Sequence, residues 1–138
     1  LDWGGLQDPR RAGIQALVRD LNALYRSRPA LHRGDCDPSG LHVIDAQSAD
    51  ENVVAFLRRG GGDDVAVVAN LSPVPREGYR LALPRAGRWQ ELLNTDASAY
   101  GGSGVGNLGA IEAVDGEWHG LPAHATIRLP PLAVTWFG

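Results

Sequence analysis

The 138-residue sequence is long enough for one domain with a real core, and its 43% apolar and 21% charged residues are ordinary values for a globular protein. Thirteen basic against sixteen acidic residues give a net charge of −3, which argues against nucleic acid as the main partner, because phosphate binding requires a basic surface. No apolar run reaches the length of a membrane span, and the single cysteine, Cys36, forms no internal disulfide.

The first element is an amphipathic helix. Asp8-Pro9 is a helix-start signal, and Pro29 ends the pattern. The apolar residues between them recur at helical spacing and form one stripe: Ile14, Leu17, Val18, Leu21, Leu24 and Tyr25. We therefore predict a helix from Pro9 to Arg28.

Short strands follow the helix. Apolar runs alternate with clusters of Gly, Pro, Asn and Asp, and Gly60 to Asp63 form a hairpin turn. The predicted strands are 41–45, 52–58, 65–71, 79–83, 89–93, 125–129 and 132–137. Strands without intervening helices predict an antiparallel β-sandwich. We expect its core to contain Val53, Ala55, Leu57, Val65, Val67, Leu81, Ile127, Val134 and Trp136.

Gly104, Gly106 and Gly109 have the G-x-G-x-x-G spacing of a dinucleotide-binding loop. That motif requires a strand before it, a long helix after it and an acid about 20 residues further on. Here only about five helix-like residues, from Ala110, precede Gly116, and the acid is missing. We conclude that the glycines turn the chain, and we expect no nucleotide cofactor.

Other candidate residues give weak signals. His119 and His124 have no third ligand, so we assign no metal site, and Cys36 lies in a turn without the context of a nucleophile. Of the tryptophans, the alternating pattern favours core positions for Trp89 and Trp136, whereas Trp118 between Gly116 and Gly120 is a candidate for exposure and sugar stacking.

Four long motifs carry a resemblance that covers nearly the whole chain. They are Leu17 to His32, Asn70 to Arg80, Gly87 to Asn107 and Leu129 to Val134. Together, and in this order, they resemble the C-terminal end of the bacterial glycogen branching enzymes, members of the α-amylase superfamily. The sequence departs from that family at Leu41 to Val43, where an aromatic pair is common, and at Leu71, where Phe is usual.

The resemblance implies a domain division. Residues 1–33 would be the last loop and helix of a catalytic (β/α)8 barrel, and residues 34–138 an all-β domain of the α-amylase C-terminal type. The absence of an initiating Met agrees with a piece of a longer chain.

The resemblance also implies a function. Such enzymes transfer α-1,4-glucan segments to form α-1,6 branches in glycogen synthesis, in the cytoplasm. Their partners would be α-glucan and the rest of the parent chain, and their three catalytic acids lie upstream, so no catalytic residue is assigned and the fragment alone should be inactive. Asp2 and Trp3 resemble a segment at the barrel mouth and are the candidate substrate-binding residues. The alternatives are the C-terminal domain of another α-amylase superfamily enzyme and a stand-alone carbohydrate-binding module.

Overall fold

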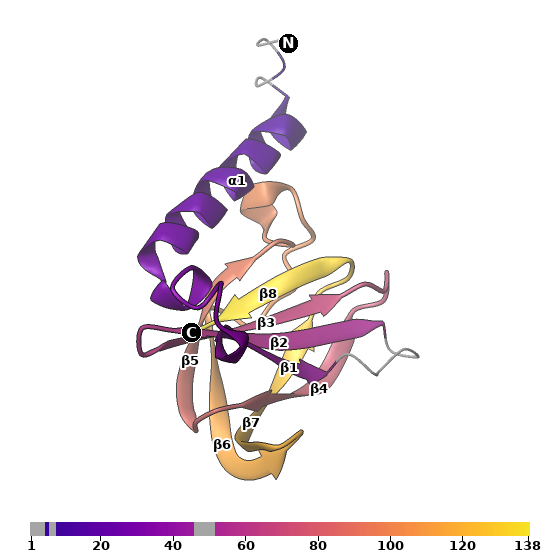
Figure 1. Ribbon diagram of the computed structural model, residues 1–138. Helices are drawn as coiled ribbons and strands as arrows, with labels where there is room; N and C mark the ends of the chain where they lie inside the picture. The colour runs from indigo at the N-terminus through magenta and orange to yellow at the C-terminus, as the bar shows by residue number, and fades with distance from the viewer. Residues whose placement is uncertain (1–4, 6–7, 46–51) are drawn as a thin grey trace.

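The computed structural model describes residue 5 and residues 8–45 and 52–138. Within these ranges a long helix leads into a curled β-sheet (Figure 1). The helices are α1 (Pro9–Ser27) and three short 3-10 helices, η2 (Pro29–Leu31), η3 (Pro38–Gly40) and η4 (Ser98–Tyr100). The strands are β1 (Leu41–Asp45), β2 (Val53–Gly60), β3 (Asp63–Asn70), β4 (Arg76–Leu83), β5 (Gly87–Asn94), β6 (Ala110–Trp118), β7 (Leu121–Leu129) and β8 (Ala133–Phe137).

The predicted helix is confirmed. The carbonyl of Asp8 accepts the first backbone hydrogen bonds, from Arg11 and Ala12, and Pro9 occupies the first helical position, where no N–H is needed. The helix ends at Ser27, and Pro29 begins η2, which buries Ala30 and Leu31. The division of the chain at residue 33 stays a prediction.

The predicted antiparallel β-fold is also confirmed. All eight strands belong to one antiparallel sheet with the order β1-β2-β3-β8-β5-β6-β7-β4. The hairpin between β2 and β3 turns at Gly61 and Gly62, whose φ angles of 62° and 78° suit glycine and match the twist of the strands.

The sheet curls around one core. Leu57 and Phe137 point inward from the β2-β3-β8 side and meet Leu81, Trp89 and residues of β7 from the other side. Trp89 is fully buried, as predicted, and its indole N–H donates to the carbonyl of Arg85. The two walls of the sheet therefore enclose the core in the manner of a sandwich.

Side chains hold the two outermost strands, β1 and β4, near each other. The hydroxyl of Tyr79 on β4 donates to the Asp45 carboxylate on β1 at 3.3 Å. His119, in the β6-β7 turn, places its Nδ1 3.1 Å from the carbonyl oxygen of Ile44. These contacts link the two ends of the strand order through side chains.

The sequence interpretation of residues 110–118 is wrong. The residues from Ala110 that looked helical belong to strand β6, which continues through Gly116 to Trp118. Ile111 and Ala113 face the core while Glu112 and Val114 face outward, so the segment has the period of a strand. Pairing with β5 and β7 outweighs the helical propensity of the Ala-Ile-Glu-Ala run.

Candidate functional site

The glycine-rich connection between β5 and β6 is held by carboxylates of the chain itself. Asp96 accepts hydrogen bonds from the backbone N–H groups of Ser103 and Val105 and from the Ser103 hydroxyl. Glu91 accepts one from the backbone N–H of Asn107 at 2.7 Å. These donors are the kind that a phosphate-binding loop would offer to its ligand.

The prediction that glycines turn the chain is confirmed at Gly104 and Gly109, which have φ angles of 80° and 90°. Gly106 serves close packing instead, because a Cβ there would lie 2.6 Å from the side-chain nitrogen of Asn94. Strand β6 follows the glycines, so the segment lacks the helix of a nucleotide-binding motif.

The two histidines of the β6-β7 hairpin bind backbone. His119 contacts the Ile44 carbonyl, and His124 places its Nδ1 3.0 Å from the carbonyl oxygen of Gly116. Within the described ranges, no three His, Cys, Asp or Glu side chains gather as metal ligands. Cys36 is exposed.

Trp118 is half-buried and already stacked. The Arg80 guanidinium lies 4.7 Å from its ring centroid, the His119 ring lies at 4.9 Å, and its indole N–H donates to the Arg80 carbonyl. These contacts occupy much of the ring that a sugar would use.

Trp136 departs from the prediction. It was expected in the core with Val134, but Thr135 and Phe137 are the β8 residues that point into the core, and both Val134 and Trp136 are half-buried on the opposite face. Alternation separates the two faces of a strand without saying which one faces the core. Here both faces are apolar, so the pattern alone was ambiguous.

We call this opposite surface of β1, β2, β3 and β8 the outer face. Paired residues form a row across the four strands on it: Val43, Phe56, Val67 and Trp136. One end of the outer face is covered by η2 and the last turns of α1, which bury Val65 and Val67. At the other end Leu41 and Val43 are exposed.

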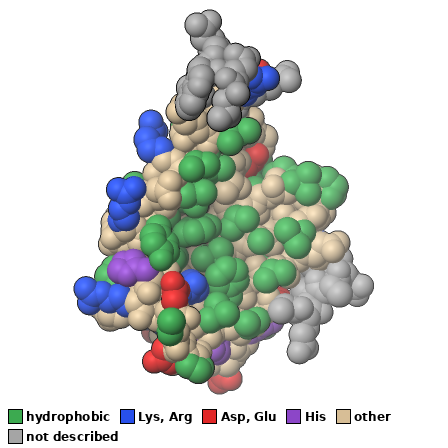
Figure 2. Space-filling model, turned by 45° about the horizontal axis from the view of Figure 1, so that its top comes forward, with side chains coloured by type: hydrophobic (Ala, Val, Ile, Leu, Met, Phe, Trp, Pro, Cys, Tyr) green, Lys and Arg blue, Asp and Glu red, His purple; other side chains and the backbone are tan. Residues whose placement is uncertain are grey.

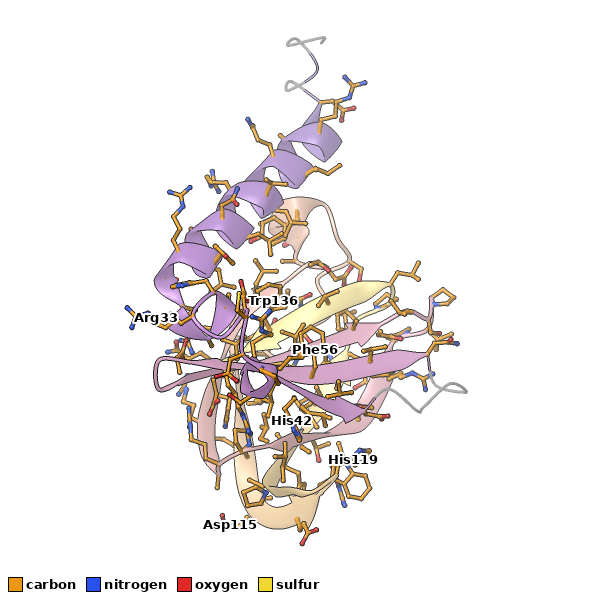
Figure 3. The ribbon with its side chains drawn as sticks, in the orientation of Figure 1. Arg33, His42, Phe56, Asp115, His119 and Trp136 are labelled. Carbon is orange, nitrogen blue, oxygen red and sulfur yellow. The ribbon has the colours of Figure 1, made fainter. Side chains whose placement is uncertain are left out.

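A pocket of about 210 Å³ opens on the outer face beside the end of α1. Phe56 and Trp136 lie close together there (Figure 3). The full lining is Tyr25, Leu31, Phe56, Arg58, Val67 and Trp136. Arg58 is the charged member and forms an ion pair with Asp35. The pocket is thus lined by aromatic and apolar side chains, and the charge of Arg58 is balanced by Asp35.

The helix α1 extends the same apolar surface. Ile14, Val18 and Tyr25 are exposed, at 62%, 52% and 49%, although they belong to the apolar stripe. Tyr25 is also part of the pocket lining. Figure 2 shows apolar side chains as one band that runs from the helix onto the sheet. A contiguous exposed apolar surface of this kind marks an interaction site.

A different side of α1 rests on η4. Gly13 is buried against the backbone of Tyr100, and the Tyr100 hydroxyl donates to Asp20 at 2.9 Å. Hydrogen bonds from Arg19 and then Tyr100 lower the pKa of Asp20 below its ordinary value. Burial, and then the bond to Asp20, raise the pKa of Tyr100.

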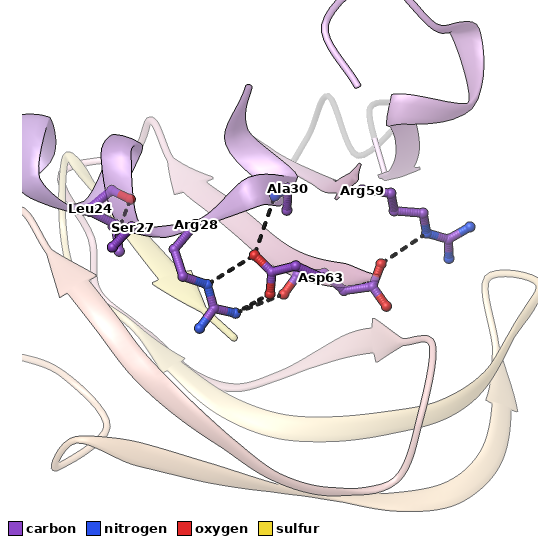
Figure 4. Close-up of polar contacts among 7 residues, drawn as sticks. Leu24, Ser27, Arg28, Ala30, Arg59 and Asp63 are labelled. Carbon is purple, nitrogen blue, oxygen red and sulfur yellow. Dashed lines mark hydrogen bonds and ion pairs between the residues drawn. The ribbon is translucent and has the colours of Figure 1, made fainter. Parts of the chain in front are cut away.

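The C-terminal end of α1 is fastened to the β2-β3 hairpin (Figure 4). Arg28 donates to both carboxylate oxygens of Asp63, at 2.6 and 3.1 Å, and also to the Asp64 carbonyl. The backbone N–H of Ala30 donates to Asp63 as well. This bidentate contact fixes the orientation of the Arg28 side chain as well as its distance from Asp63, because the guanidinium is planar.

A larger groove of about 610 Å³ lies on the far wall, over β4, β6 and β7. Its polar lining includes Glu77, Glu112, Thr126 and Arg128, and the Arg128–Glu77 ion pair spans part of it. Phe, Trp and Tyr are absent from the described residues that line it, so it offers no platform for stacking a sugar ring.

A family model described as the alpha amylase C-terminal all-beta domain matches residues 43–138. The chain belongs to this family. As an alpha-amylase C-terminal domain, it has the mainly β fold with a preceding helix that the resemblance implied.

The domain is also similar to curated proteins named 1,4-alpha-glucan branching enzyme GlgB. It is 52% identical to that of Cereibacter sphaeroides over 96% of this chain, 51% identical to that of Frankia casuarinae over 99%, and 49% identical to that of Mycobacterium bovis over 99%. The matched segment is 18%, 17% and 19% of these relatives, so the chain spans less than a fifth of their length.

The candidate substrate-binding residues Asp2 and Trp3 lie outside the described residues. Sequence reasoning found Tyr25 and the apolar stripe, but it placed Trp136 in the core and did not single out Phe56. The signal for the outer face was available in the sequence of β2, where Val54 and Phe56 alternate with other apolar residues, so that both faces of the strand are apolar: Val53, Ala55 and Leu57.

Proposed function

We propose that this chain is the C-terminal portion of a 1,4-α-glucan branching enzyme, which transfers segments of α-1,4-glucan to form α-1,6 branches in glycogen synthesis. The observation that carries the proposal is identity of 49–52% over 96–99% of the chain to proteins of that name. The substrate would be an α-glucan such as glycogen or amylose, and the enzyme would act in the cytoplasm.

The catalytic acids belong to another part of the parent in this proposal. A retaining glycosyl transfer needs two carboxyl groups about 5 Å apart, on either side of the bond that is broken. By the resemblance, these acids would lie in a barrel upstream of residue 1, and residues 1–33 would be the end of that barrel. The C-terminal β-domain would support the barrel, and residues 1–138 would be inactive alone. Asp2 and Trp3 would lie near substrate.

The experiment is an assay for new α-1,6 linkages in amylose. The full-length parent should produce them, and residues 1–138 alone should not exceed a buffer control. Absence of branching by a folded full-length parent would overturn the proposed activity, and branching by residues 1–138 would overturn the upstream position of the catalytic acids.

A second measurement concerns Trp3. In the full-length enzyme, Trp3→Ala should reduce transfer with little change in melting temperature if the ring contacts glucan. A large loss of stability with normal activity per folded molecule would instead assign the ring to packing.

A further inference from the structure

We propose that one polar side of α1 is a docking surface for an acidic helix of another protein. We call this side the arginine strip, and its members are Arg11, Gln15, Arg19, Asn22 and Arg26. The proposal goes beyond the proposed function, because it assigns a protein partner and does not depend on the branching of glucan.

The members of the strip lie on one face of the helix. They follow one another at intervals of four, four, three and four residues, and side chains at such intervals are neighbours on a helix surface. All five are exposed. The apolar Ile14 and Val18 each come one residue earlier than a member of the strip, so the apolar stripe is on an adjoining side. Figure 2 shows basic side chains that project along one flank of the apolar band.

The strip carries positive charge without an acid of its own. The one acidic residue of α1, Asp20, accepts a hydrogen bond from Tyr100 on η4. Asp20 also contacts Nε of Arg19 at 3.0 Å, but the Arg19 side chain remains 74% exposed. Among the residues that the structure describes, Arg26 has no ion-pair partner. The helix dipole favours a cation in the last turn, where Arg26 lies, but it does not account for Arg19 in the middle of the helix.

The charge of the chain is divided between the helical segment and the sheet. Residues 8–33 contain six arginines and two aspartates, whereas residues 34–138 contain seven arginines and thirteen acidic residues. An acidic partner is therefore attracted by the helical segment and repelled by the rest of the chain. This division directs the encounter to the strip, since complementary charge steers association and opposes wrong orientations.

The spacing of the arginines matches carboxylates on a second helix. At a rise of about 1.5 Å per residue, Arg11 and Arg19 are about 12 Å apart along the helix axis, and Arg19 and Arg26 are about 10 Å apart. Glutamates or aspartates eight and seven residues apart on a partner helix have the same spacing. Each guanidinium can bind a carboxylate through two parallel hydrogen bonds, and the amides of Gln15 and Asn22 both donate and accept between them.

A nucleic acid matches the strip less well than an acidic helix does. A nucleic acid strand carries a phosphate about every 3.4 Å, so most of its charges would find no arginine along the strip. Those unpaired phosphates would also lie near a sheet that has an excess of acidic residues. A partner helix can carry its carboxylates only where the arginines are, so we assign the surface to a protein.

The test measures the binding of a synthetic peptide to the full-length enzyme by fluorescence anisotropy. The probe is an alanine-rich helical peptide with glutamates eight and seven residues apart, and the control peptide has glutamine in place of each glutamate. We expect the acidic peptide to bind at low ionic strength, with an affinity that falls as salt is added, and the control peptide not to bind. Equal affinity of the two peptides would overturn the proposal.

Two double variants with the same loss of charge show where the peptide binds. Arg19→Gln with Arg26→Gln changes the strip, whereas Arg85→Gln with Arg88→Gln changes two exposed arginines at the start of β5. The strip variant should bind the acidic peptide at least about threefold more weakly, the size expected for exposed ion pairs, and the β5 variant should bind it as the wild type does. Glutamine is a good helix former, and circular dichroism checks that α1 is kept. Equal weakening in both variants would mean that the peptide responds only to net charge, which would overturn the strip.

Competition experiments distinguish the kinds of partner. Linear polyphosphate that displaces the acidic peptide at a lower concentration of charge than the peptide itself would overturn the choice of a helix. Self-association of the wild type that the strip variant lacks would overturn it in favour of the acidic sheet of a second copy. Branching activity should be the same in both variants, so loss of that activity in the wild type would remove the proposed function without affecting this result.

Discussion

Gly13 of α1 lies directly against the backbone of Tyr100 in η4. A Cβ placed on Gly13 would lie 2.6 Å from the Tyr100 carbonyl oxygen and 2.8 Å from its carbonyl carbon. Because both atoms belong to backbone, the contact cannot be relieved by a change of rotamer. The glycine thus sets the distance between the helix and the β-domain.

The first prediction is that Gly13→Ala destabilises the chain although alanine is the better helix former. Helix propensity alone would stabilise by about 1 kcal/mol, whereas overpacking costs about 1–3 kcal/mol, so the helix must shift. Urea unfolding followed by circular dichroism measures the difference. Ala23→Gly, at an exposed position of the same helix, calibrates the propensity term. A more stable Gly13→Ala variant would show that the contact is not tight.

The second prediction concerns the pH dependence of the Tyr100–Asp20 bond. The pKa of Tyr100 is raised above its ordinary value of 10.0, so its stabilising effect is complete below pH 10 and is lost as the pH rises through the raised pKa. Tyr100→Phe should therefore lower stability near pH 8 and lose less additional stability than the wild type between pH 9 and 11.

The Asp20 carboxylate of the same pair affects stability at low pH. The pKa of Asp20 is lowered below 3.8, so its contribution is present above pH 3.8 and is lost as the pH falls through the lowered pKa. Denaturant midpoints of the wild type and Tyr100→Phe, measured from pH 3 to 11, test both ends. If the curves of denaturant midpoint against pH run parallel for the wild type and Tyr100→Phe from pH 3 to 11, the role given to the Tyr100–Asp20 hydrogen bond is contradicted.

The third prediction is that Asp96→Asn loosens the glycine-rich connection. The Asp96 carboxylate accepts three hydrogen bonds within the connection, and an amide has one acceptor oxygen in place of two. We expect a loss of about 2 kcal/mol, the range for hydrogen bonds to a charged group. Hydrogen exchange should accelerate at the amides of Ser103 and Val105. The control is Asp115→Asn on β6, at an exposed position, which should leave both rates unchanged.

The fourth prediction is that lysine does not replace Arg28. Lys offers a single ammonium where the guanidinium reaches both oxygens of Asp63, so Arg28→Lys should cost about 1–2 kcal/mol although the charge is kept. Arg26→Lys, an exposed change two residues earlier, should have almost no effect. Equal free energies of unfolding for the two variants would mean that the contact acts only through its charge.

Local patterns predicted the helix, the hairpin at Gly61 and Gly62 and most of the strands, because each depends on neighbours in sequence. The strand β6 was missed because its alternating residues include Ala and Glu, which favour helices. Only its pairing with β5 and β7 makes this segment a strand. The surface role of Trp136 was missed for a related reason, since the choice of face depends on β3 and β5, distant in sequence.

The apolar surface formed by α1 and the outer face was predicted in part. The stripe of Ile14, Val18 and Tyr25 follows from helical spacing, although the spacing alone does not say that these three side chains are exposed. The Gly13–Tyr100 contact joins residues 87 positions apart, and a single sequence contains no signal for such a pair. The pocket likewise needs residues from the helix and three strands at once.

Strand β8 joins the two halves of the sheet, since it lies between β3 and β5 and buries Phe137 at the centre of the core. During synthesis, the β1-β2-β3 hairpins and the β4 to β7 strands leave the ribosome first, and each group has an open edge where β8 will pair. The core cannot close until residues 133–137 have emerged from the exit tunnel. The nascent chain therefore carries open, apolar strand edges until β8 has been made, and edges of this kind can pair with other chains.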